Sequence, residues 1–363
     1  MSNRRFSALN LVVALFVVTA ACICIPYVPF TIQPTAPTQP PVIADRVGAA
    51  QSATPTATET STPSPSPSPQ VTCPSLLVDM LAASKGSDAP SKSPRRRFPV
   101  IQNEETLVTY QVEGDQLVNP ELDPVPESLR SYQRDTATQR AIWDYFTTII
   151  PSDQREIVNQ YIVFTDGRED ILAAVEQHGD DPALWALDVD ILDSSDQKAL
   201  GATLLHEFGH LLTLNTSQIV TDINVYDNPD DQLAYDQAAA DCPQYFVADG
   251  CSLPDSYINN FYQRFWPDIY AQWEQINAIE DDETRDNHLY GFYKAHRDQF
   301  VTDYAVTSPE EDIAESWMFF ILDPKPAGDT IAEQKILFFY DWPELAQLRD
   351  EIISRVCTYF KQP

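Results

Sequence analysis

The segment SSDQKALGATLLHEFGHLLTLNT, residues 194–216, decides the fold that we predict for this chain. Its apolar residues recur every three or four positions, which is the period of a helix with one buried face. Ser194 and Gln197 fit a capping box, so we expect the helix to begin there. Gly209 inside a helix costs about 1 kcal/mol relative to Ala, and we therefore expect another element to pack close to its backbone. The apolar stripe consists of Leu200, Leu204, Phe208, Leu211 and Leu212.

Two histidines on this helix predict a zinc site. His206 and His210 lie four positions apart, which places their imidazoles on one helix face with Cβ atoms about 5–6 Å apart. Two nitrogens at that spacing can bind one zinc ion at about 2.0–2.1 Å. Glu207 lies one position further round the helix, where its carboxylate can take a proton from a zinc-bound water whose pKa the metal lowers to roughly 7. Since the chain holds only five histidines, we interpret the motif as a catalytic site with one Zn2+ per chain.

The third ligand does not follow the spacing of two familiar enzyme classes. A metzincin has Gly and then His or Asp at set positions after the second histidine, but Thr213 and Thr216 stand there. A thermolysin-like enzyme has its ligand Glu soon after the histidines, but no Glu occurs between His210 and Glu274. We therefore expect the third ligand from a segment further along the chain.

The best candidate for this ligand lies in the stretch YAVTSPEEDIAE, residues 304–315. Ser308 can cap a helix that has Pro309 in its first turn. Glu311 and Glu315 then share one helix face, where like charges repel each other. A metal ligand, Glu311, beside a carboxylate that orients a ligand histidine, Glu315, explains this pair. The alternative is that Glu311 serves only as the third residue of the capping box.

Together these two segments resemble the catalytic domain of anthrax lethal factor and related bacterial zinc peptidases, which have a zincin fold. The resemblance is carried by His206-Glu207-Phe208-Gly209-His210 and by Tyr304, Glu311, Ala314 and Glu315, and it covers these short segments alone. It implies that Glu311 is the third zinc ligand and that Glu315 lies just outside the metal shell. It also implies that Tyr304 points at the developing oxyanion, a role that suits a fixed hydroxyl donor.

Other residues offer weaker alternatives for metal binding. His288 or His296 could replace Glu311 as the third ligand, whereas His178 sits in a polar turn. The stretch after the motif helix is acidic, and a weak calcium site is an alternative interpretation there, although its spacing matches no EF-hand loop. We interpret these acids as solvated turn residues: Asp222, Asp227, Asp230 and Asp231.

Residues 1–30 have the features of an export signal. Arg4 and Arg5 precede an almost unbroken apolar run from Leu9 to Ile25. Small residues before Cys22 fit a bacterial lipoprotein signal, in which the lipidated cysteine becomes the new N-terminus. The alternatives are an uncleaved helix anchor, since the run approaches the roughly 20 residues that span a bilayer, or cleavage and secretion. We expect a membrane-tethered protein on the bacterial cell surface, with its catalytic domain outside.

A spacer separates this signal from the folded region. Residues 31–70 are rich in Pro, Thr, Ser and Ala and cannot bury enough apolar surface to fold, so we expect a disordered linker. Residues 71–100 form a transition segment with a basic triplet at Arg95-Arg96-Arg97. We assign residues 101–363 to one zinc metallopeptidase domain.

Four cysteines outside the signal form an even set, which in an exported protein indicates disulfides. Cys242 with Cys251 is the local pairing. Cys73 with Cys357 would then join the start of the folded region to its end. The alternative for Cys73 is to cap a catalytic zinc from a propeptide.

The remaining pattern predicts an α+β fold. Residues 105–112 and 161–164 read as strands and 138–150 as a helix. From Trp185 to Ile191 large apolar residues alternate with small or acidic ones, which predicts a half-exposed strand. We expect a small twisted sheet over the motif helix and a helical C-terminal half that supplies Glu311 from below. We further expect the 185–191 strand to be the sheet edge along which an extended peptide pairs.

These features predict an extracellular zinc metalloendopeptidase that acts on a peptide or protein substrate. A nucleic-acid partner is excluded, because a formal net charge of −31 repels phosphates. Two alternatives remain, a surface binding module with a structural zinc and a zinc amidase that acts on cell-wall peptide. Three protein ligands leave an open coordination position, which favours catalysis over a structural zinc.

Overall fold

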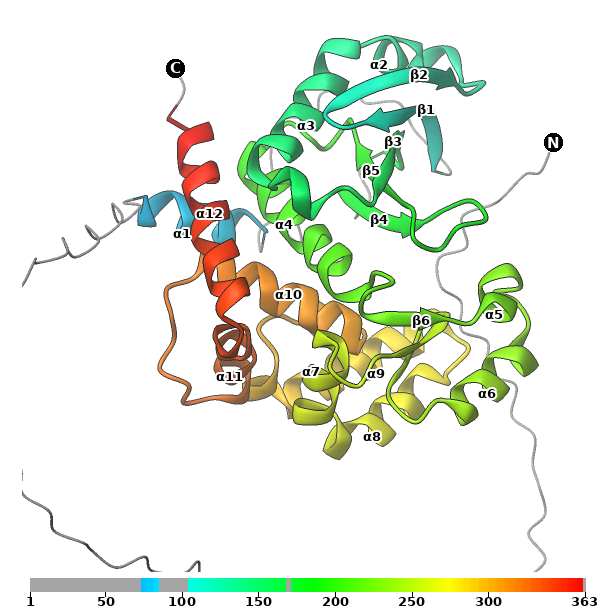
Figure 1. Cartoon of the computed structure of the whole chain (residues 1–363), viewed down its shortest axis with the longest axis vertical. Coiled ribbons are helices and arrows are strands. Elements are labelled where there is room, and N and C mark those ends of the chain that lie inside the picture. The colour runs from blue at the N-terminus through cyan, green and yellow to red at the C-terminus, as the bar shows by residue number, and fades with distance from the viewer. Residues whose placement is uncertain (1–72, 85–103, 168–170, 362–363) are drawn as a thin grey trace, which may run out of the picture. The chain divides into compact units, whose positions relative to one another are not determined.

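The computed structural model describes residues 73–84, 104–167 and 171–361, and these residues form an α+β fold (Figure 1). The predicted export signal, the linker at 31–70 and the basic triplet lie outside the described residues. None of the helices in the described ranges has both the length and the apolar character that crossing a bilayer requires. The membrane tether therefore stays a prediction from the sequence.

A five-stranded mixed sheet forms the upper part of the domain in Figure 1. β3 and β5 run parallel, and the other neighbouring strands are antiparallel. Gly114 lies in the turn between β1 and β2 with a φ of 62°, a conformation that favours glycine. The strands, in the spatial order β2-β1-β3-β5-β4, are β1 (Glu105–Glu113), β2 (Gln116–Leu122), β3 (Val158–Thr165), β4 (Ala173–Gln177) and β5 (Trp185–Asp190).

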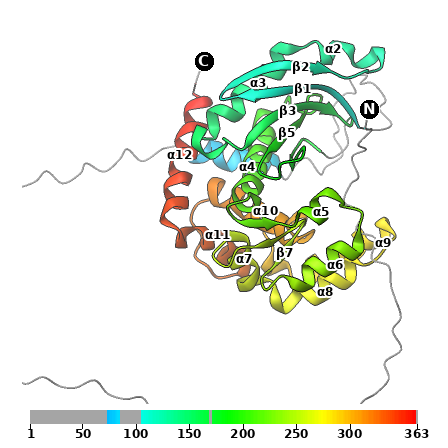
Figure 2. The same ribbon diagram turned by 45° about the vertical axis from the view of Figure 1, so that its right-hand side comes forward.

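Helices pack against this sheet and carry much of the core. The short helix α2 (Arg130–Gln133) leads into α3 (Thr136–Ile149). Trp143 of α3 is fully buried, and its ring centre lies 5.4 Å from that of Tyr161 on β3. α4 (Gln197–Leu214) contacts α3 and β4. It lies between the sheet and the helices of the second half of the chain (Figure 1, Figure 2).

The strand β5 is internal and buried, which corrects two expectations. All six of its residues are buried, and it lies between β3 and β4, so the sheet edge next to it is β4. Both of its acids, Asp188 and Asp190, are buried instead of facing water. The Asp190 carboxylate accepts the N–H groups of Asp166 at 2.9 Å and Leu192 at 2.6 Å. The predictions of a half-exposed strand and of a peptide-pairing edge at residues 185–191 are therefore wrong.

The motif helix α4 begins later than the predicted capping box. Asp196 is its N-cap, and its carboxylate accepts the N–H groups of Lys198 at 2.9 Å and Ala199 at 3.2 Å. Ser194 instead donates its hydroxyl hydrogen to the Ile191 carbonyl at 3.0 Å. The helix itself is confirmed, but the expected cap at Ser194 is wrong. The sequence offered both residues, and Asp is as good an N-cap as Ser.

The second half of the chain is mainly helical, as predicted. α10 is almost entirely buried and packs against α4, which brings two segments far apart in the sequence side by side. A Cβ atom at Gly209 would lie 3.1 Å from both Ala314 Cα and Trp317 Cδ1 of α10, so the predicted close approach at this glycine is confirmed. The helices are α7 (Tyr257–Phe265), α8 (Pro267–Asn277), α9 (Asp282–Ala295), α10 (Pro309–Leu322), α11 (Ile331–Phe338) and α12 (Pro343–Tyr359).

A small insertion lies between the motif helix and α7. Its three short strands form a second sheet in the order β6-β8-β7. The Cys242–Cys251 disulfide joins the end of its second helix to β8, as predicted. The elements of the insertion are β6 (Ile219–Thr221), α5 (Ile223–Asp227), α6 (Gln232–Asp241), β7 (Phe246–Val247) and β8 (Gly250–Ser252).

A second disulfide, Cys73–Cys357, joins the residue before α1 (Pro74–Ser84) to α12. α1 packs against α4, and the Lys198 ammonium lies 2.7 Å from the Asp79 carboxylate. Part of the predicted transition segment at 71–100 thus packs with the domain. The predicted pairing is confirmed, and the alternative role of the first cysteine as a zinc cap is wrong. Two disulfides are typical of proteins that fold outside the reducing cytoplasm.

Candidate metal centre

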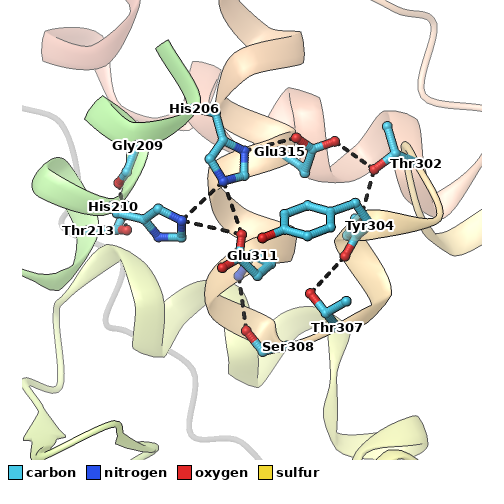
Figure 3. A network of polar contacts seen from close by, with 11 residues as sticks. His206, Gly209, His210, Thr213, Thr302, Tyr304, Thr307, Ser308, Glu311 and Glu315 are labelled. Carbon is cyan, nitrogen blue, oxygen red and sulfur yellow. Dashed lines mark hydrogen bonds and ion pairs between the residues drawn. The ribbon is translucent and has the colours of Figure 1, made fainter. Parts of the chain in front are cut away.

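The helix α4 presents His206 and His210 toward α10 (Figure 3). Both residues are buried, with 6% and 8% of their surface exposed. Their Nε2 atoms lie 3.1 Å apart, and the two ring planes are inclined by 76°. The two nitrogens therefore converge on one point.

Glu311 brings a third donor atom to the same point. Ser308 is the N-cap of α10, and its hydroxyl oxygen accepts the Glu311 N–H at 3.1 Å, as the sequence predicts. The Glu311 carboxylate extends to the histidines, with Oε2 3.0 Å from His206 Nε2 and 3.3 Å from His210 Nε2. The capping role and the ligand role are compatible, because one uses the backbone of Glu311 and the other its side chain.

The three donor atoms have the spacing of a tetrahedral zinc site. With metal–ligand distances of about 2.0 Å, neighbouring ligands of a tetrahedral ion lie about 3.3 Å apart. The three separations here are 3.0, 3.1 and 3.3 Å. Two imidazoles and one carboxylate also form a known ligand set of catalytic zinc. His206, His210 and Glu311 therefore fit a divalent metal ion, and three protein ligands would leave one position of a tetrahedral ion open.

A second carboxylate orients His206. Glu315 lies one turn after Glu311 on α10, and its Oε1 is 2.8 Å from His206 Nδ1. When Nδ1–H donates to this carboxylate, the Nε2 lone pair is directed at the other donor atoms. Glu315 is itself buried, so water does not compete strongly for this bond. The geometry matches the orienting role that we predict for Glu315.

Glu207 is buried beside the three donor atoms but is not one of them. Its carboxylate accepts the backbone N–H of Val175, which holds the edge strand β4 against α4. Burial raises the pKa of the Glu207 carboxyl to about 6, although the nearby imidazoles of His206 and His210 and the Val175 N–H lower it. A carboxyl group with this pKa can accept and release a proton near neutral pH.

Tyr304 opens the 3-10 helix η4 (Tyr304–Val306), just before α10. Its ring centre lies 5.9 Å from that of His206, and its hydroxyl group points toward Glu311 in Figure 3. The residue is 53% exposed, but burial of its hydroxyl end and the charges of Glu311 and Glu207 raise its pKa. The hydroxyl therefore stays protonated and can donate a hydrogen bond at the ligand cluster.

The charges of the site are strongly coupled. Burial lowers the pKa of His206, but its bonds to Glu311 and Glu315 outweigh burial and raise this pKa well above its usual value. Burial raises the pKa of Glu311, but the two imidazoles outweigh it and hold this pKa well below its usual range. The carboxylates thus bring negative charge to the imidazoles. A bound divalent cation would neutralise this negative charge.

The alternative ligands considered from the sequence do not join this cluster. His178, His288 and His296 contact polar groups outside it. Asp222 and Asp231 are the N-caps of α5 and α6, where their carboxylates accept backbone N–H groups. Within the described ranges, the acids after the motif helix form no group of converging ligand atoms, so the calcium alternative gains no support.

A second group of carboxylates, Asp166, Asp190 and Asp193, also converges. Asp190 is fully buried, and its oxygens accept the backbone N–H groups of Asp166, Leu192 and Asp193. These bonds hold the turn after β5. We therefore interpret this second group as part of the fold.

Sequence reasoning missed two contributors to the site, Thr302 and Val175. Thr302 donates its hydroxyl hydrogen to Glu315 at 2.6 Å. Val175 contributes only its backbone N–H to Glu207. Neither residue carries a motif or a spacing signal, because each reaches the site through the packing of separate elements.

No family model, curated protein sequence or solved structure matches the chain. The interpretation of the site therefore rests on the geometry of its own residues. His206, His210 and Glu311 form a candidate mononuclear metal centre, and Glu207 is a buried acid beside it.

Proposed function

We propose that the chain is a zinc-dependent metallopeptidase with a zincin-like catalytic domain. The observation that carries the proposal is the convergence of His206 Nε2, His210 Nε2 and Glu311 Oε2 at 3.0 to 3.3 Å from one another. Glu207 supports it, since a buried carboxyl group lies beside this cluster without belonging to it. A structural zinc usually has four protein ligands, whereas three ligands and a free acid favour a catalytic role.

Each side chain around the cluster can have a separate role in amide hydrolysis. A bound zinc ion supplies a Lewis acid that polarises the scissile carbonyl and lowers the pKa of a water molecule to about 7. Glu207 accepts the proton of the attacking water and passes it to the leaving amine, which suits a carboxyl pKa of about 6. Tyr304 donates its hydroxyl hydrogen to the oxygen that gains negative charge, and Glu315 keeps His206 in the tautomer of a ligand.

The edge strand β4 supports an extended peptide as the substrate. Its outer edge faces α4, because the Val175 N–H donates to Glu207 and not to another strand. A peptide that adds to this edge through backbone hydrogen bonds would pass the ligand cluster. N-methylation of one backbone N–H in a flanking residue of the substrate should lower kcat/KM about 2- to 10-fold if that bond forms. Equal cleavage of every N-methylated peptide in a positional series would contradict pairing along β4.

The proposed place of action is the bacterial cell surface. The two disulfides favour an oxidising compartment. The apolar segment and the Pro-rich linker that would tether the domain are features of the sequence outside the described residues. Peptides or proteins outside the cell are therefore the proposed substrates.

Glu207→Gln tests the proposed chemistry. The purified full chain should hold one equivalent of zinc, and the variant should keep this zinc while peptide hydrolysis falls about 10²- to 10⁴-fold. Glu280→Gln changes an exposed glutamate and is the matched control, which should leave both properties unchanged. Hydrolysis that persists in Glu207→Gln, or wild-type protein without stoichiometric metal, would refute the proposal.

The same preparations separate the two alternative functions. A zinc-loaded chain that leaves casein-like substrates intact would favour a surface binding module. Digestion of purified peptidoglycan in place of protein would favour an amidase that acts on cell-wall peptide. Either outcome would leave the metal centre in place. The first would replace the proposed catalytic role by a binding role, and the second would change only the proposed substrate.

A further inference from the structure

Thr302 lies between the Glu315 carboxylate and the turn that begins at Tyr304 (Figure 3). Its hydroxyl oxygen is 2.6 Å from Glu315 Oε2 and accepts the backbone N–H of Ala305 at 3.1 Å. Glu315 in turn holds the Nδ1–H of His206 at 2.8 Å. Ala305 follows Tyr304 in η4, so its bond fixes the turn that presents the tyrosine. One hydroxyl group therefore binds both the carboxylate that orients His206 and the backbone turn that holds Tyr304.

The direction of these bonds follows from the chemistry of a hydroxyl group. A threonine hydroxyl has one hydrogen to donate and can accept at the same oxygen. Because the oxygen accepts the Ala305 N–H, its own hydrogen goes to Glu315 Oε2. Both oxygens of the Glu315 carboxylate are then engaged, Oε1 by His206 and Oε2 by Thr302. The carboxylate cannot rotate without breaking one of these bonds.

We propose that Thr302 is a positioning residue that couples the orientation of the His206 imidazole to the placement of the Tyr304 ring. It acts through Glu315 on one side and through the Ala305 backbone on the other. Loss of the hydroxyl group frees the carboxylate and the turn at the same time. The proposal rests on the proposed metal centre and adds a residue that no sequence motif marks.

Two substitutions and a matched control test the role of this hydroxyl group. Thr302→Val removes the hydroxyl and nearly keeps the shape of the side chain, whereas Thr302→Ser keeps the hydroxyl. Thr307→Val is the control, because the Thr307 hydroxyl donates to the Tyr304 carbonyl of the same turn at 2.9 Å. Competition with a chromogenic chelator measures the zinc affinity of each full chain.

The affinity for zinc should change only when the hydroxyl at position 302 is lost. Thr302→Val should bind zinc about tenfold more weakly, the lower end of the range for groups that support metal ligands. Thr302→Ser and Thr307→Val should stay within about twofold of the wild type, because the bond to Glu315 is kept in both. In an active enzyme, Thr302→Val should also lower kcat less in a Tyr304→Phe background than alone, since coupled residues are not additive.

A measurement on the metal-free chain separates this inference from the proposed function. NMR can follow hydrogen exchange with water at the His206 Nδ1–H and at the Ala305 N–H. Both hydrogens should exchange at least about tenfold faster in Thr302→Val than in the wild type, because both sit in bonds that the hydroxyl supports. Both should remain slow in Thr302→Ser.

Three outcomes overturn or redirect the inference. Unchanged zinc affinity in a folded Thr302→Val chain overturns it, whether or not the chain hydrolyses peptides. Faster exchange at Ala305 alone also overturns it, because Thr302 would then serve only the turn. If the wild type binds no zinc, the proposed function fails, and the exchange measurement still decides the role of Thr302. Should the Val variant not fold, Thr302→Ala provides a second hydroxyl-free side chain for the same measurements.

Discussion

Lys335→Met tests whether a buried ion pair stabilises the helix that carries Glu311. Lys335 on α11 and Asp312 on α10 are fully buried, and the Lys335 Nζ lies 2.6 Å from Asp312 Oδ2. Trp266 Nε1 donates to the same oxygen at 2.9 Å. Burial raises the pKa of Asp312 to about 6, although Lys335 lowers it. The Asp312 charge therefore depends on its lysine.

The expected cost follows from leaving this carboxylate alone in the interior. Removing one partner of a buried ion pair costs about 3–5 kcal/mol, whereas exposed pairs contribute about 0–1 kcal/mol. The Lys335 Nζ also lies 4.1 Å from the centre of the Phe300 ring, and the loss of this cation–π contact adds in the same direction. Met fills a volume close to that of Lys, so a cavity contributes little. We expect Lys335→Met to lower the free energy of unfolding by about 4 kcal/mol.

The assay is equilibrium urea unfolding of the full chain near neutral pH, with disulfides intact and EDTA present so that metal binding adds no stability. Arg264→Met removes one partner of the exposed Arg264–Asp341 pair and should cost under about 1 kcal/mol. The double variant Lys335→Met/Asp312→Asn removes both charges and should recover most of the loss. A cost for Lys335→Met as small as that of the control, or a double variant no more stable than the single one, would refute the reasoning.

Three further predictions concern packing, pH and the disulfides. Gly209→Ala should weaken zinc binding in chelator competition, since the new Cβ would lie 3.1 Å from atoms of α10. The control Gly291→Ala meets no atom within 4 Å, so it should raise the free energy of unfolding by about 1 kcal/mol. Burial raises the pKa of Asp190 to about 7, above its value of roughly 3.9 in the unfolded chain, so its contribution to stability is largest at low pH and is lost as the pH rises between these values. Asp190→Asn should flatten that slope in urea unfolding. Replacing Cys73 and Cys357 by Ser opens a loop with a sequence separation of 284 and should cost up to about 5–6 kcal/mol in the same assay.

Controls for these three predictions come from the same chain. The Cys242–Cys251 disulfide spans a sequence separation of only 9, so its removal should cost about 3 kcal/mol, less than that of the long-range bridge. Equal costs for the two bridges would contradict the chain-entropy argument. Undiminished zinc affinity in Gly209→Ala would contradict the close packing of α4 and α10. An unfolding free energy of Asp190→Asn with the same pH slope as the wild type would show that another group titrates.

Local features of the candidate site could be predicted from the sequence because they act within a few residues. The common face of His206 and His210 follows from the pitch of any α-helix. The cap at Ser308 follows from the unpaired N–H groups of a helix start. The chemistry of these segments is therefore readable without knowledge of their neighbours.

The arrangement of the strands could not be predicted in the same way. The edge of a sheet depends on pairing between distant segments, and residues 185–190 pair with both β3 and β4. An acid that accepts backbone N–H groups in the interior, such as Asp190, has the same sequence pattern as an acid that faces water. The alternation of residues therefore led us to predict an exposed face and an edge position for a strand that is buried inside the sheet.

The sequence by itself determined a helix with two imidazoles and an acid in register, a second capped helix with two carboxylates, and an even set of cysteines. Only the tertiary structure decided that Glu311 lies 3.0 Å from His206 across a sequence separation of 105. It alone also decided the bond from Thr302 to Glu315 and the burial of Lys335 against Asp312. Helix periodicity and capping are short-range, whereas the approach of α10 to α4 depends on burying apolar surface from the whole domain.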